Sequence, residues 1–137
     1  MRLLIWHVDG FNAEPTERGR SKVADAEPRT ISIGEGLVVF AATEQADEAE
    51  PGAVAGRAAQ AVAEMAKQLG VRAVVLHSFA HLFVELSTPE AAQHVLTATQ
   101  IQLEAEGYNV EQTAFGWFNR LDIQAKGHPL SRVARQV

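Results

Sequence analysis

Cysteine is absent from this sequence of 137 residues, so disulfide bonds and thiolate nucleophiles are both excluded. The absence is compatible with an intracellular protein. Long apolar runs are absent as well. The opening MRLLIWHVDG contains one arginine, and its short apolar stretch ends at His7 and Asp9. Such a stretch is too short for a membrane span or a signal peptide, so we interpret it as the first strand of a soluble protein.

Positive charge is also scarce, because 12 Lys and Arg face 17 Asp and Glu and the net charge is −5. A broad nucleic-acid surface needs a dense cationic face, so this balance argues against one. The charge is uneven, however. Residues 113–137 hold four cations against Asp122 alone: Arg120, Lys126, Arg132 and Arg135. A small basic patch there could contact a few phosphates, and an ordinary solvated surface explains the pattern equally well.

The hydrophobic content of 47% predicts one compact domain with a core and leaves no room for a second full domain. The apolar runs at 3–8 and 37–43 predict buried strands. The polar segment 11–36 between them is rich in Pro and Gly and predicts a long loop. The alanine-rich stretch after Pro51 has apolar residues at helical spacing and predicts a helix that ends at Gly70.

The second half of the chain repeats this alternation of strand and helix. Residues 72–79 predict a third strand that follows the first helix directly, as in a strand–helix–strand crossover. Thr88 is a natural N-cap for a second helix that begins at Pro89 and continues to Gly107.

The last thirty residues are expected to be mostly strand. Residues 108–125 predict a hairpin or a bulged pair around Gly116, and the sequence LSRVARQ at 130–136 predicts a short final helix. The whole pattern predicts a single α/β domain with a sheet of about five strands and two main helices. It contains no internal repeat.

Three kinds of chemical site can be weighed from motifs. His77 and His81 have a spacing that binds metal on a helix, but the first falls in a predicted strand and the second beyond its end, so we expect no metal site. The GEG at 34–36 leads into a strand and is not a phosphate loop. Ser78, His81 and Asp9 could form a triad on paper, but no nucleophile-elbow sequence surrounds the serine.

The ends of the predicted strands remain as the best place for a ligand. In open α/β sheets ligands gather outside strand ends, and the segments 78–81 and 115–120 both occupy such positions. Gly116 would allow a ligand to approach the backbone. For each residue taken alone, a core role is the more common explanation: His81 as a hydrogen-bonded core histidine, and Trp117 and Phe118 as core aromatics.

Five segments, taken together, resemble a known family. They are MRLLIWHVDG, GLVVFAATEQADE, SFAHLFVELSTP, AFGWFNR and AKGHPLSR, and they occur in order over nearly the whole chain. This is similar to the N-terminal editing domain of archaeal threonyl-tRNA synthetases. The resemblance implies a D-aminoacyl-tRNA deacylase-like fold over 1–137. It also implies a cytoplasmic protein without metal or cofactor, which binds the aminoacylated CCA end of tRNA.

The activity that the resemblance implies is hydrolysis of L-serine wrongly attached to threonine tRNA. Serine lacks only the methyl group of threonine, and such a difference is worth about 1–3 kcal/mol in an apolar pocket, too little for accurate translation. A second site that hydrolyses the smaller product makes up the difference. The family is thought to use a direct water attack, assisted by the 2′-hydroxyl of the terminal adenosine.

The resemblance also implies roles for individual residues. It places His81 beside the seryl group as a selecting residue and treats His77 as structural. Asn119, Arg120 and His81 are the candidates for catalysis. The remaining expected contacts are, for the substrate, Ser78, Phe79, Ala80, His81, Ala92, Phe115, Gly116, Trp117 and Phe118, and, for the terminal adenosine, Ala42, Thr43 and Glu44.

The sequence departs from this family at two positions. Asn119 stands where the family usually has a lysine, and Arg132 stands where it often has a glutamate. Asn119 can orient a water but carries no positive charge, so Arg120, Arg132 or Lys126 could replace that charge. Alternatively, the RNA hydroxyl performs the chemistry and the side chains matter little, or the activity is weakened.

Two other functions stay open. A true D-aminoacyl-tRNA deacylase would share the fold, but its SQFT-like and Gly-Pro motifs are replaced here by SFAHL and KGHP. The second alternative is a binding domain that has lost hydrolysis. Because relatives continue beyond a similar position, we expect the chain to be part of a longer protein with synthetase or anticodon-binding modules. A homodimer is common on this fold, and no sequence feature indicates one.

Overall fold

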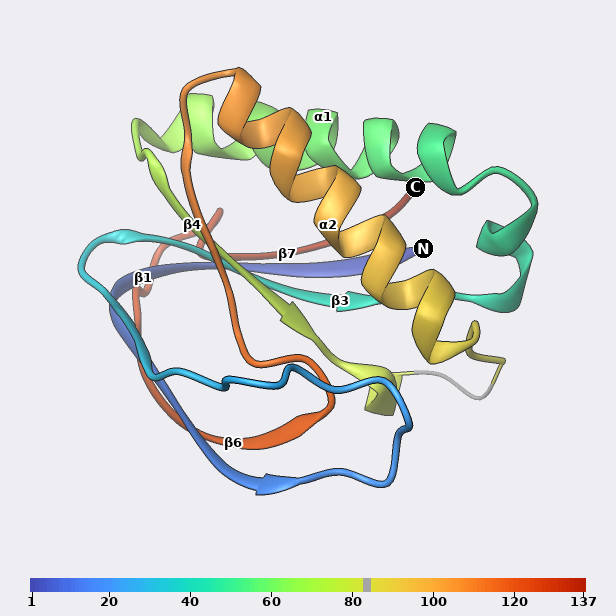
Figure 1. The fold of residues 1–137 in the computed structure, drawn as a ribbon. Coiled ribbons are helices and arrows are strands. Elements are labelled where there is room, and N and C mark those ends of the chain that lie inside the picture. Colours follow the sequence, from blue (N-terminus) through green and yellow to red (C-terminus); the bar gives the residue numbers. More distant parts are fainter. Residues whose placement is uncertain (83–84) are drawn as a thin grey trace.

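Two helices lie against one face of a mixed β-sheet in the computed structural model, which describes residues 1–82 and 85–137 (Figure 1). The elements follow one another in the order β1 (Arg2–Arg18), β2 (Ile31–Ile33), β3 (Gly36–Ala42), η1 (Gln45–Ala49), α1 (Pro51–Leu69), β4 (Ala73–Ser78), η2 (Ala80–Leu82), α2 (Pro89–Ala105), β5 (Asn109–Gln112), β6 (Trp117–Ala125) and β7 (Arg132–Gln136). No helix in this described part is both long and apolar enough to cross a membrane.

Strand β1 organises the sheet because four other strands pair with it. The sheet order is β2-β1-β3-β4-β5, and β6 and β7 also pair with β1. In the first half of β1, Ile5 lies between Val39 of β3 and Val133 of β7. In the second half, Asn12 lies between β2 and β6. A bulge between Val8 and Gly10 separates the halves, and bulges of this kind increase the bend and twist of a strand.

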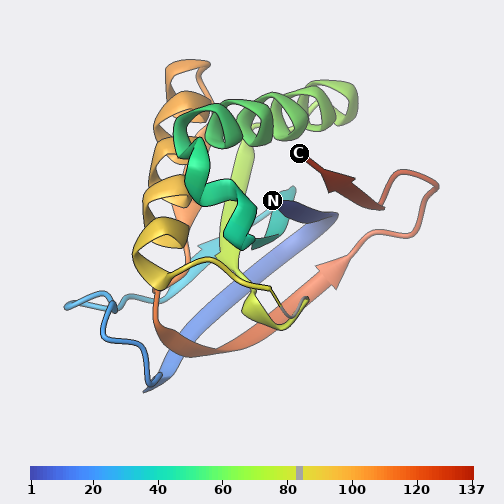
Figure 2. The same cartoon turned by 90° about the vertical axis from the view of Figure 1, so that its right-hand side faces the viewer.

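Helices α1 and α2 lie on the same side of the sheet because each belongs to a crossover between parallel strands. Helix α1 joins β3 to β4, α2 joins β4 to β5, and both strand pairs are parallel. Figure 2 shows both helices on this face of the sheet. Thr88 caps α2 by accepting a hydrogen bond from the Ala91 N–H, and Gly70 ends α1 in the left-handed conformation with φ 70°.

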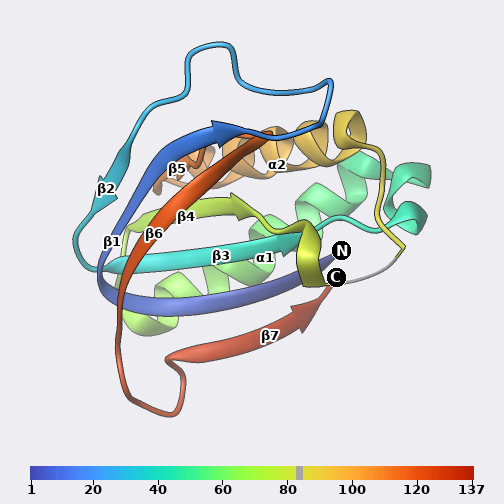
Figure 3. The same cartoon turned by 90° about the horizontal axis from the view of Figure 1, so that it is seen from below.

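The core has one hydrophobic cluster on each face of the sheet. Under the helices, Leu3, Ile5 and Leu37 pack with buried residues of α1 and α2 such as Val62 and Leu103. Alternation along the strands sends their neighbours to the other face, where Val8, Phe11, Val38, Phe40 and Val75 pack with Leu121 and Ile123 of β6. Figure 3 shows β6 running beside the second half of β1 on this side.

The predicted single α/β domain with two main helices is confirmed, and the described residues form seven strands where about five were expected. The long loop predicted at 11–36 is wrong in part, because β1 continues to Arg18 and β2 occupies 31–33. Pro15 is tolerated inside β1 because the pairing with β6 is irregular between Pro15 and Glu17, where a missing N–H costs little.

Two further predictions near the C-terminus are wrong. Residues 108–125 form no hairpin: β5 pairs in parallel with β4, and β6 pairs with the distant β1. The final helix predicted at 130–136 is the strand β7, which pairs with residues 2–6 of β1 on the side not taken by β3. In both cases the backbone partner lies far away in the sequence, so local pattern could not identify it.

Candidate functional site

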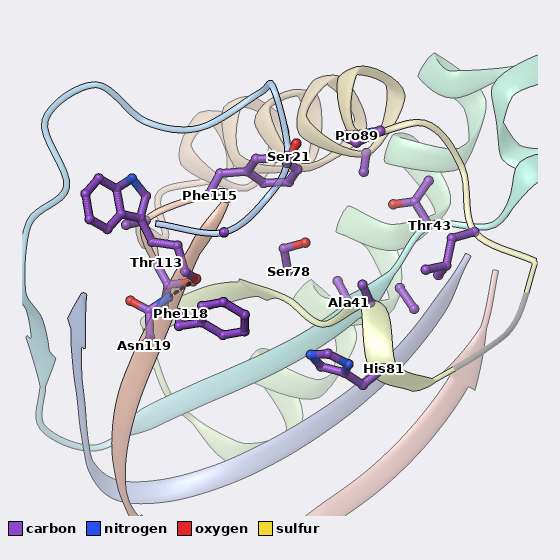
Figure 4. A pocket seen from close by; sticks show the side chains of 18 of the residues that line it. Ser21, Ala41, Thr43, Ser78, His81, Pro89, Thr113, Phe115, Phe118 and Asn119 are labelled. Atoms are coloured by element: carbon purple, nitrogen blue, oxygen red, sulfur yellow. Dashed lines mark hydrogen bonds between the residues drawn. The ribbon is translucent and has the colours of Figure 1, made fainter. Parts of the chain in front are cut away.

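A cavity of about 310 Å³ opens where the parallel strands β3 and β4 end (Figure 4). Ser78 lies near the middle of its floor, with Thr43 and Pro89 on one side and Phe118 and Asn119 on the other. The residues that line it are Gly19, Arg20, Ser21, Ala41, Ala42, Thr43, Ser78, Ala80, His81, Leu86, Ser87, Pro89, Ala92, Thr113, Ala114, Phe115, Gly116, Trp117, Phe118 and Asn119. Its size is that of a small-molecule site.

The floor of the cavity is built by the ends of β3 and β4. The Phe79 N–H donates to the Ala41 carbonyl at 2.8 Å, so the two strands stay paired up to the point where η2 begins. Phe79 itself packs on Phe40 in the core and does not line the cavity. Its ring meets the exposed His81 ring edge to face at 5.5 Å. Phe79 is therefore a support that places His81 at the rim.

The segment from Thr113 to Asn119 forms a second wall. The Thr113 N–H donates to the Leu76 carbonyl at 3.1 Å, which ties the start of this wall to β4. Gly116 has φ 75°, a conformation that favours glycine. The Asn119 amide donates from Nδ2 to the Trp117 carbonyl at 3.0 Å, while its Oδ1 is buried and has no partner among the described residues. This oxygen is therefore an unsatisfied acceptor enclosed behind the cavity wall, with almost no accessible surface.

A third wall comes from the connection between β1 and β2, which is clamped to the second wall. Four hydrogen bonds hold it: Gly19 N–H to the Gly116 carbonyl at 2.8 Å, Asp25 N–H to the Phe115 carbonyl at 2.9 Å, Phe115 N–H to Asp25 Oδ2 at 2.8 Å, and Trp117 Nε1–H to the Asp25 carbonyl at 2.9 Å. A Cβ on Gly116 would overlap the Val23 carbonyl and Ala24. This part of the connection is thus a fixed wall.

The remaining side of the cavity belongs to the first turn of α2 and the residues before it. Ser87 N–H donates to the Thr43 carbonyl at 3.0 Å, and Thr88 N–H donates to Glu48 Oε1 at 2.6 Å. These bonds hold the segment across from β3. Pro89 and Ala92 then face the cavity with small side chains.

The structure brings most of the expected site residues together in this one cavity. Those that line it are Ala42, Thr43, Ser78, Ala80, His81, Ala92, Phe115, Gly116, Trp117, Phe118 and Asn119. Sequence reasoning missed the wall at 19–21 and also Ala41, Leu86, Ser87, Pro89, Thr113 and Ala114. Little in the sequence indicates that residues 19–21 belong to the site, because the segment 11–36 contains the glycines and charged residues that are typical of any loop. The expected segment SFAHLFVELSTP includes residues 83–84, which lie outside the described residues.

Four expected charged residues do not line the cavity. Glu44 accepts a hydrogen bond from Arg2 Nε at 3.0 Å. Lys126 is paired with Asp9 at 2.5 Å and with Glu35 at 3.1 Å. The Arg132 guanidinium lies over the Trp6 ring at 5.3 Å, and Arg120 is exposed on β6. Lys126, Arg132 and Arg120 therefore do not supply, inside the cavity, the positive charge of the lysine that the family usually has at position 119.

The histidines form no metal-binding group with acidic side chains within residues 1–82 and 85–137. His77 is buried, and its Nδ1 lies 2.8 Å from Thr113 Oγ1. Burial, with a smaller contribution from the charge of His81, lowers the pKa of His77 to about 4, so the ring is neutral at physiological pH. Asp9 is occupied by Lys126, and no hydrogen bond between Ser78 and a histidine occurs in this described part. A Ser–His–Asp triad is not assembled.

The cavity thus offers small apolar side chains and a few hydrogen-bonding groups, without a carboxylate among its described lining residues. Arg20 is the only Lys or Arg among those residues, and His81 is their only titratable imidazole. Such a site can bind and orient a small polar ligand. It provides few groups for acid–base catalysis.

Comparison with known proteins identifies the family of this chain. A model of the archaea-specific editing domain of threonyl-tRNA synthetase matches residues 1–137. Threonine–tRNA ligases of Methanopyrus kandleri and Methanocaldococcus jannaschii are 37% identical over 139 residues and 36% identical over 138 residues. Each alignment covers 100% of this chain and 22% of the relative, so the chain spans about a fifth of the length of these relatives.

A solved structure with the same architecture is the c-Myc DNA Unwinding Element Binding Protein. It matches with a TM-score of 0.67 and 15% identity, over 100% of this chain and 99% of that chain. At this identity the match shows a shared fold alone, in agreement with the D-aminoacyl-tRNA deacylase-like class expected from the sequence. The family match, in contrast, extends over every residue. The chain belongs to the archaea-specific editing domains of threonyl-tRNA synthetases.

Proposed function

We propose that this domain removes L-serine from mischarged threonine tRNA by hydrolysing the ester between the amino acid and the terminal adenosine. The observation that carries the proposal is the small cavity at the ends of β3 and β4 in a member of the editing-domain family. Only the aminoacylated CCA end has to enter it. The body of the tRNA would be held by other modules of the protein, so a net charge of −5 is no obstacle.

The lining of the cavity suits selection by size. Ala42, Ala80 and Ala92 keep its walls close to the backbone, and Pro89 adds a rigid apolar surface. In this proposal the seryl group lies between Ser78 and His81, and the extra methyl of threonine meets the wall that His81 completes. One methyl group changes the binding free energy by only about 1–3 kcal/mol, so a separate editing step is needed to remove serine. In this step, a close-fitting cavity wall excludes the threonyl group.

Direct attack by water is the mechanism that these residues support best. Cysteine is absent, Ser78 has no base, and the described lining residues include no carboxylate. In this proposal the 2′-hydroxyl of the terminal adenosine positions the water, accepts its proton and passes its own proton to the departing 3′-oxygen, so that no protein base is required. The role left to the protein is to orient the reactants and to stabilise the developing oxyanion.

Two groups at the second wall fit these orienting roles. Asn119 lines the cavity, and a rotation of its side chain would bring the amide, whose buried Oδ1 has no partner in the described part of the chain, to the attacking water or the substrate ammonium. The Gly116 N–H donates to no other described residue and can serve the ester oxygen. The family resemblance implies that the backbone of residues 79–81 and 115–116 holds the ester end, but the Phe79 and Phe115 N–H groups already donate to the Ala41 carbonyl and the Asp25 carboxylate.

The proposal is tested with the purified protein and three substrates charged on tRNA: L-serine on threonine tRNA, L-threonine on the same tRNA, and a D-amino acid. We expect rapid loss of L-serine, while L-threonine and the D-amino acid remain attached. Preferred cleavage of the D-aminoacyl ester would instead assign the activity to a D-aminoacyl-tRNA deacylase. Equal cleavage of serine and threonine would contradict the selective role of the cavity.

A binding domain without hydrolysis is the second candidate. Two features favour it: the described lining residues include no carboxylate, and Asn119 stands where the family usually has a lysine. The two functions differ in one measurement. A binding domain would retain affinity for a non-hydrolysable seryl-adenosine analogue and release no serine from seryl-tRNA. An editing domain would bind the analogue and would also release serine from seryl-tRNA.

A further inference from the structure

The wall formed by the β1–β2 connection carries the positive charge of an otherwise uncharged cavity. Arg20 lines the cavity and is exposed, and the described lining residues include no other Arg or Lys and no Asp or Glu. No ion pair or hydrogen bond joins its guanidinium to another described residue. A guanidinium that is free of partners beside a cavity is ready to bind an anionic group of the ligand.

The neighbours of Arg20 extend this charge along the rim. Arg18 and Lys22 are exposed and, like Arg20, form no ion pair with a described residue. We refer to residues 18–22 as the basic rim. The chain as a whole carries a net charge of −5 and repels anions. The basic rim can therefore attract an anionic ligand locally, although the rest of the surface repels it.

The basic rim is held in place before any ligand arrives. The Gly19 N–H donates to the Gly116 carbonyl at 2.8 Å, and a Cβ on Gly19 would meet that same carbonyl oxygen at 2.9 Å. Beyond the rim, Asp25 is bonded to Phe115 through both its backbone and its side chain. The backbone that carries Arg20 is therefore already ordered, and binding through Arg20 costs little backbone entropy.

We propose that Arg20 binds the phosphodiester between the last two nucleotides of the RNA 3′ end, and that Arg18 and Lys22 contact the phosphates that precede it. This inference rests on the proposed function, because it assigns the anchor of the same ligand. An aminoacylated 3′ end has two kinds of charge: the ammonium of the amino acid and the backbone phosphates. The guanidinium attracts the phosphate and repels the ammonium.

The attraction of the guanidinium for the phosphate and its repulsion of the ammonium determine the orientation of the ligand. The phosphate lies at the basic rim, and the aminoacyl group points away from it, towards Ser78 on the floor of the cavity and His81 at the opposite rim. None of the four cations that sequence analysis placed near the C-terminus lines the cavity. Lys126 is neutralised by Asp9 and Glu35, and Arg132 lies over Trp6.

The test compares two unreactive ligands, seryl-3′-amino-3′-deoxyadenosine with a free 5′-hydroxyl and the same compound with a 5′-phosphate. For the wild-type protein we expect the phosphate to raise the affinity about tenfold, which is the scale of one charge-assisted hydrogen bond. In Arg20→Gln the two ligands should bind with equal affinity, close to that of the 5′-hydroxyl compound in the wild type. Arg20→Lys should retain part of the preference because it keeps the charge but not the planar fork.

Lys67→Gln is the matched control, because it removes one exposed cation from the last turn of α1, which leads to the start of β4 and not to its end. It should keep the full preference for the phosphate. With a CCA trinucleotide ligand that carries the same seryl amide, Arg20→Gln should also reduce the slope of log affinity against log salt by about 0.7. Circular dichroism melting confirms that each variant is folded.

The possible failures are distinct. Equal affinity of the wild type for the two adenosine ligands would overturn the role of Arg20 and leave the proposed function intact. The same holds if Arg20→Gln weakens both ligands by the same factor, because the arginine would then act on the amino acid or on the fold. If the wild-type protein binds neither ligand, the proposed function itself fails and the anchor falls with it.

Discussion

The Nδ1 of His77 lies 2.8 Å from the Oγ1 of Thr113, in a buried hydrogen bond that joins the interior of β4 to the wall of the cavity. His77 also packs edge to face against Phe40, with ring centroids 5.5 Å apart. Burial keeps this imidazole neutral, so the ring is a structural hydrogen-bonding group. It positions Thr113, and through it the first residues of the second wall.

This neutral histidine makes the stability of the fold depend on pH. Its pKa is lowered from 6.5 to about 4 in the folded state, so the unfolded state binds the proton more readily. Stability is therefore complete above about pH 6.5 and is lost as the pH falls towards 4, by about 3 kcal/mol for a shift of this size. Burial and the charge of Lys126 lower the pKa of His7 as well, and that group acts in the same direction.

Urea unfolding between pH 7.5 and 4 measures this effect. His77→Phe keeps the aromatic packing and removes the titrating group, so we expect a flatter profile than that of the wild type over this range. The double variant His77→Phe, Thr113→Val serves as the control for the hydroxyl that the single change leaves unpaired. A wild-type slope retained in both variants would assign the acid sensitivity to other groups.

Gly116 is expected to be the least replaceable glycine of the cavity. Its φ of 75° is strained for a residue with a side chain, and a Cβ would overlap the Val23 carbonyl and Ala24. Gly116→Ala should lower the free energy of unfolding by roughly 2 kcal/mol or more. Gly127→Ala is the matched control, because a Cβ there meets nothing within 4 Å, and its effect should stay within about 0.5 kcal/mol. Equal denaturation midpoints for the two variants would contradict the tight contact between the β1–β2 connection and the segment that contains Gly116.

The parts of the fold that sequence analysis predicted are those encoded by local signals. Thr88, Pro89 and Gly70 mark helix ends through interactions with residues a few positions away, so α1 and α2 were predictable. The extension of β1 to Arg18 and the strand β7 depend on pairing between distant segments, such as Leu3 with Arg135. No local pattern encodes such a partner.

The same distinction holds at the cavity. Ser78 and His81 follow a recognisable buried strand, so their place at a strand end could be expected. Arg20 comes from a polar connection whose position is fixed by contacts with Phe115 and Gly116, almost a hundred residues later in the chain. Only the three-dimensional structure shows that this connection is a wall of the site.

His81→Ala is expected to weaken discrimination between serine and threonine. The ring lies at the cavity rim, supported edge to face by Phe79, and its removal leaves room for the extra methyl group. The ratio of kcat/KM for seryl-tRNA over threonyl-tRNA should fall about tenfold, within the range of about 1–3 kcal/mol for one methyl group. His94→Ala, on the exposed side of α2, is the control that should leave the ratio unchanged. A ratio in His81→Ala equal to that of the wild type would remove His81 from the selecting role.

Replacing the 2′-hydroxyl of the terminal adenosine with hydrogen is expected to reduce turnover more than Asn119→Ala does. Asn119 offers one buried acceptor, Oδ1, and removing an orienting group of this kind costs part of the rate. The 2′-hydroxyl is the proposed proton relay between the water and the departing 3′-oxygen, and the described lining residues contain no carboxylate to take its place. Single-turnover deacylation of seryl-tRNA with each change separates the two effects. The reverse order would show that a protein side chain drives the reaction, and Asn119 would then be the first residue to examine as the catalytic group.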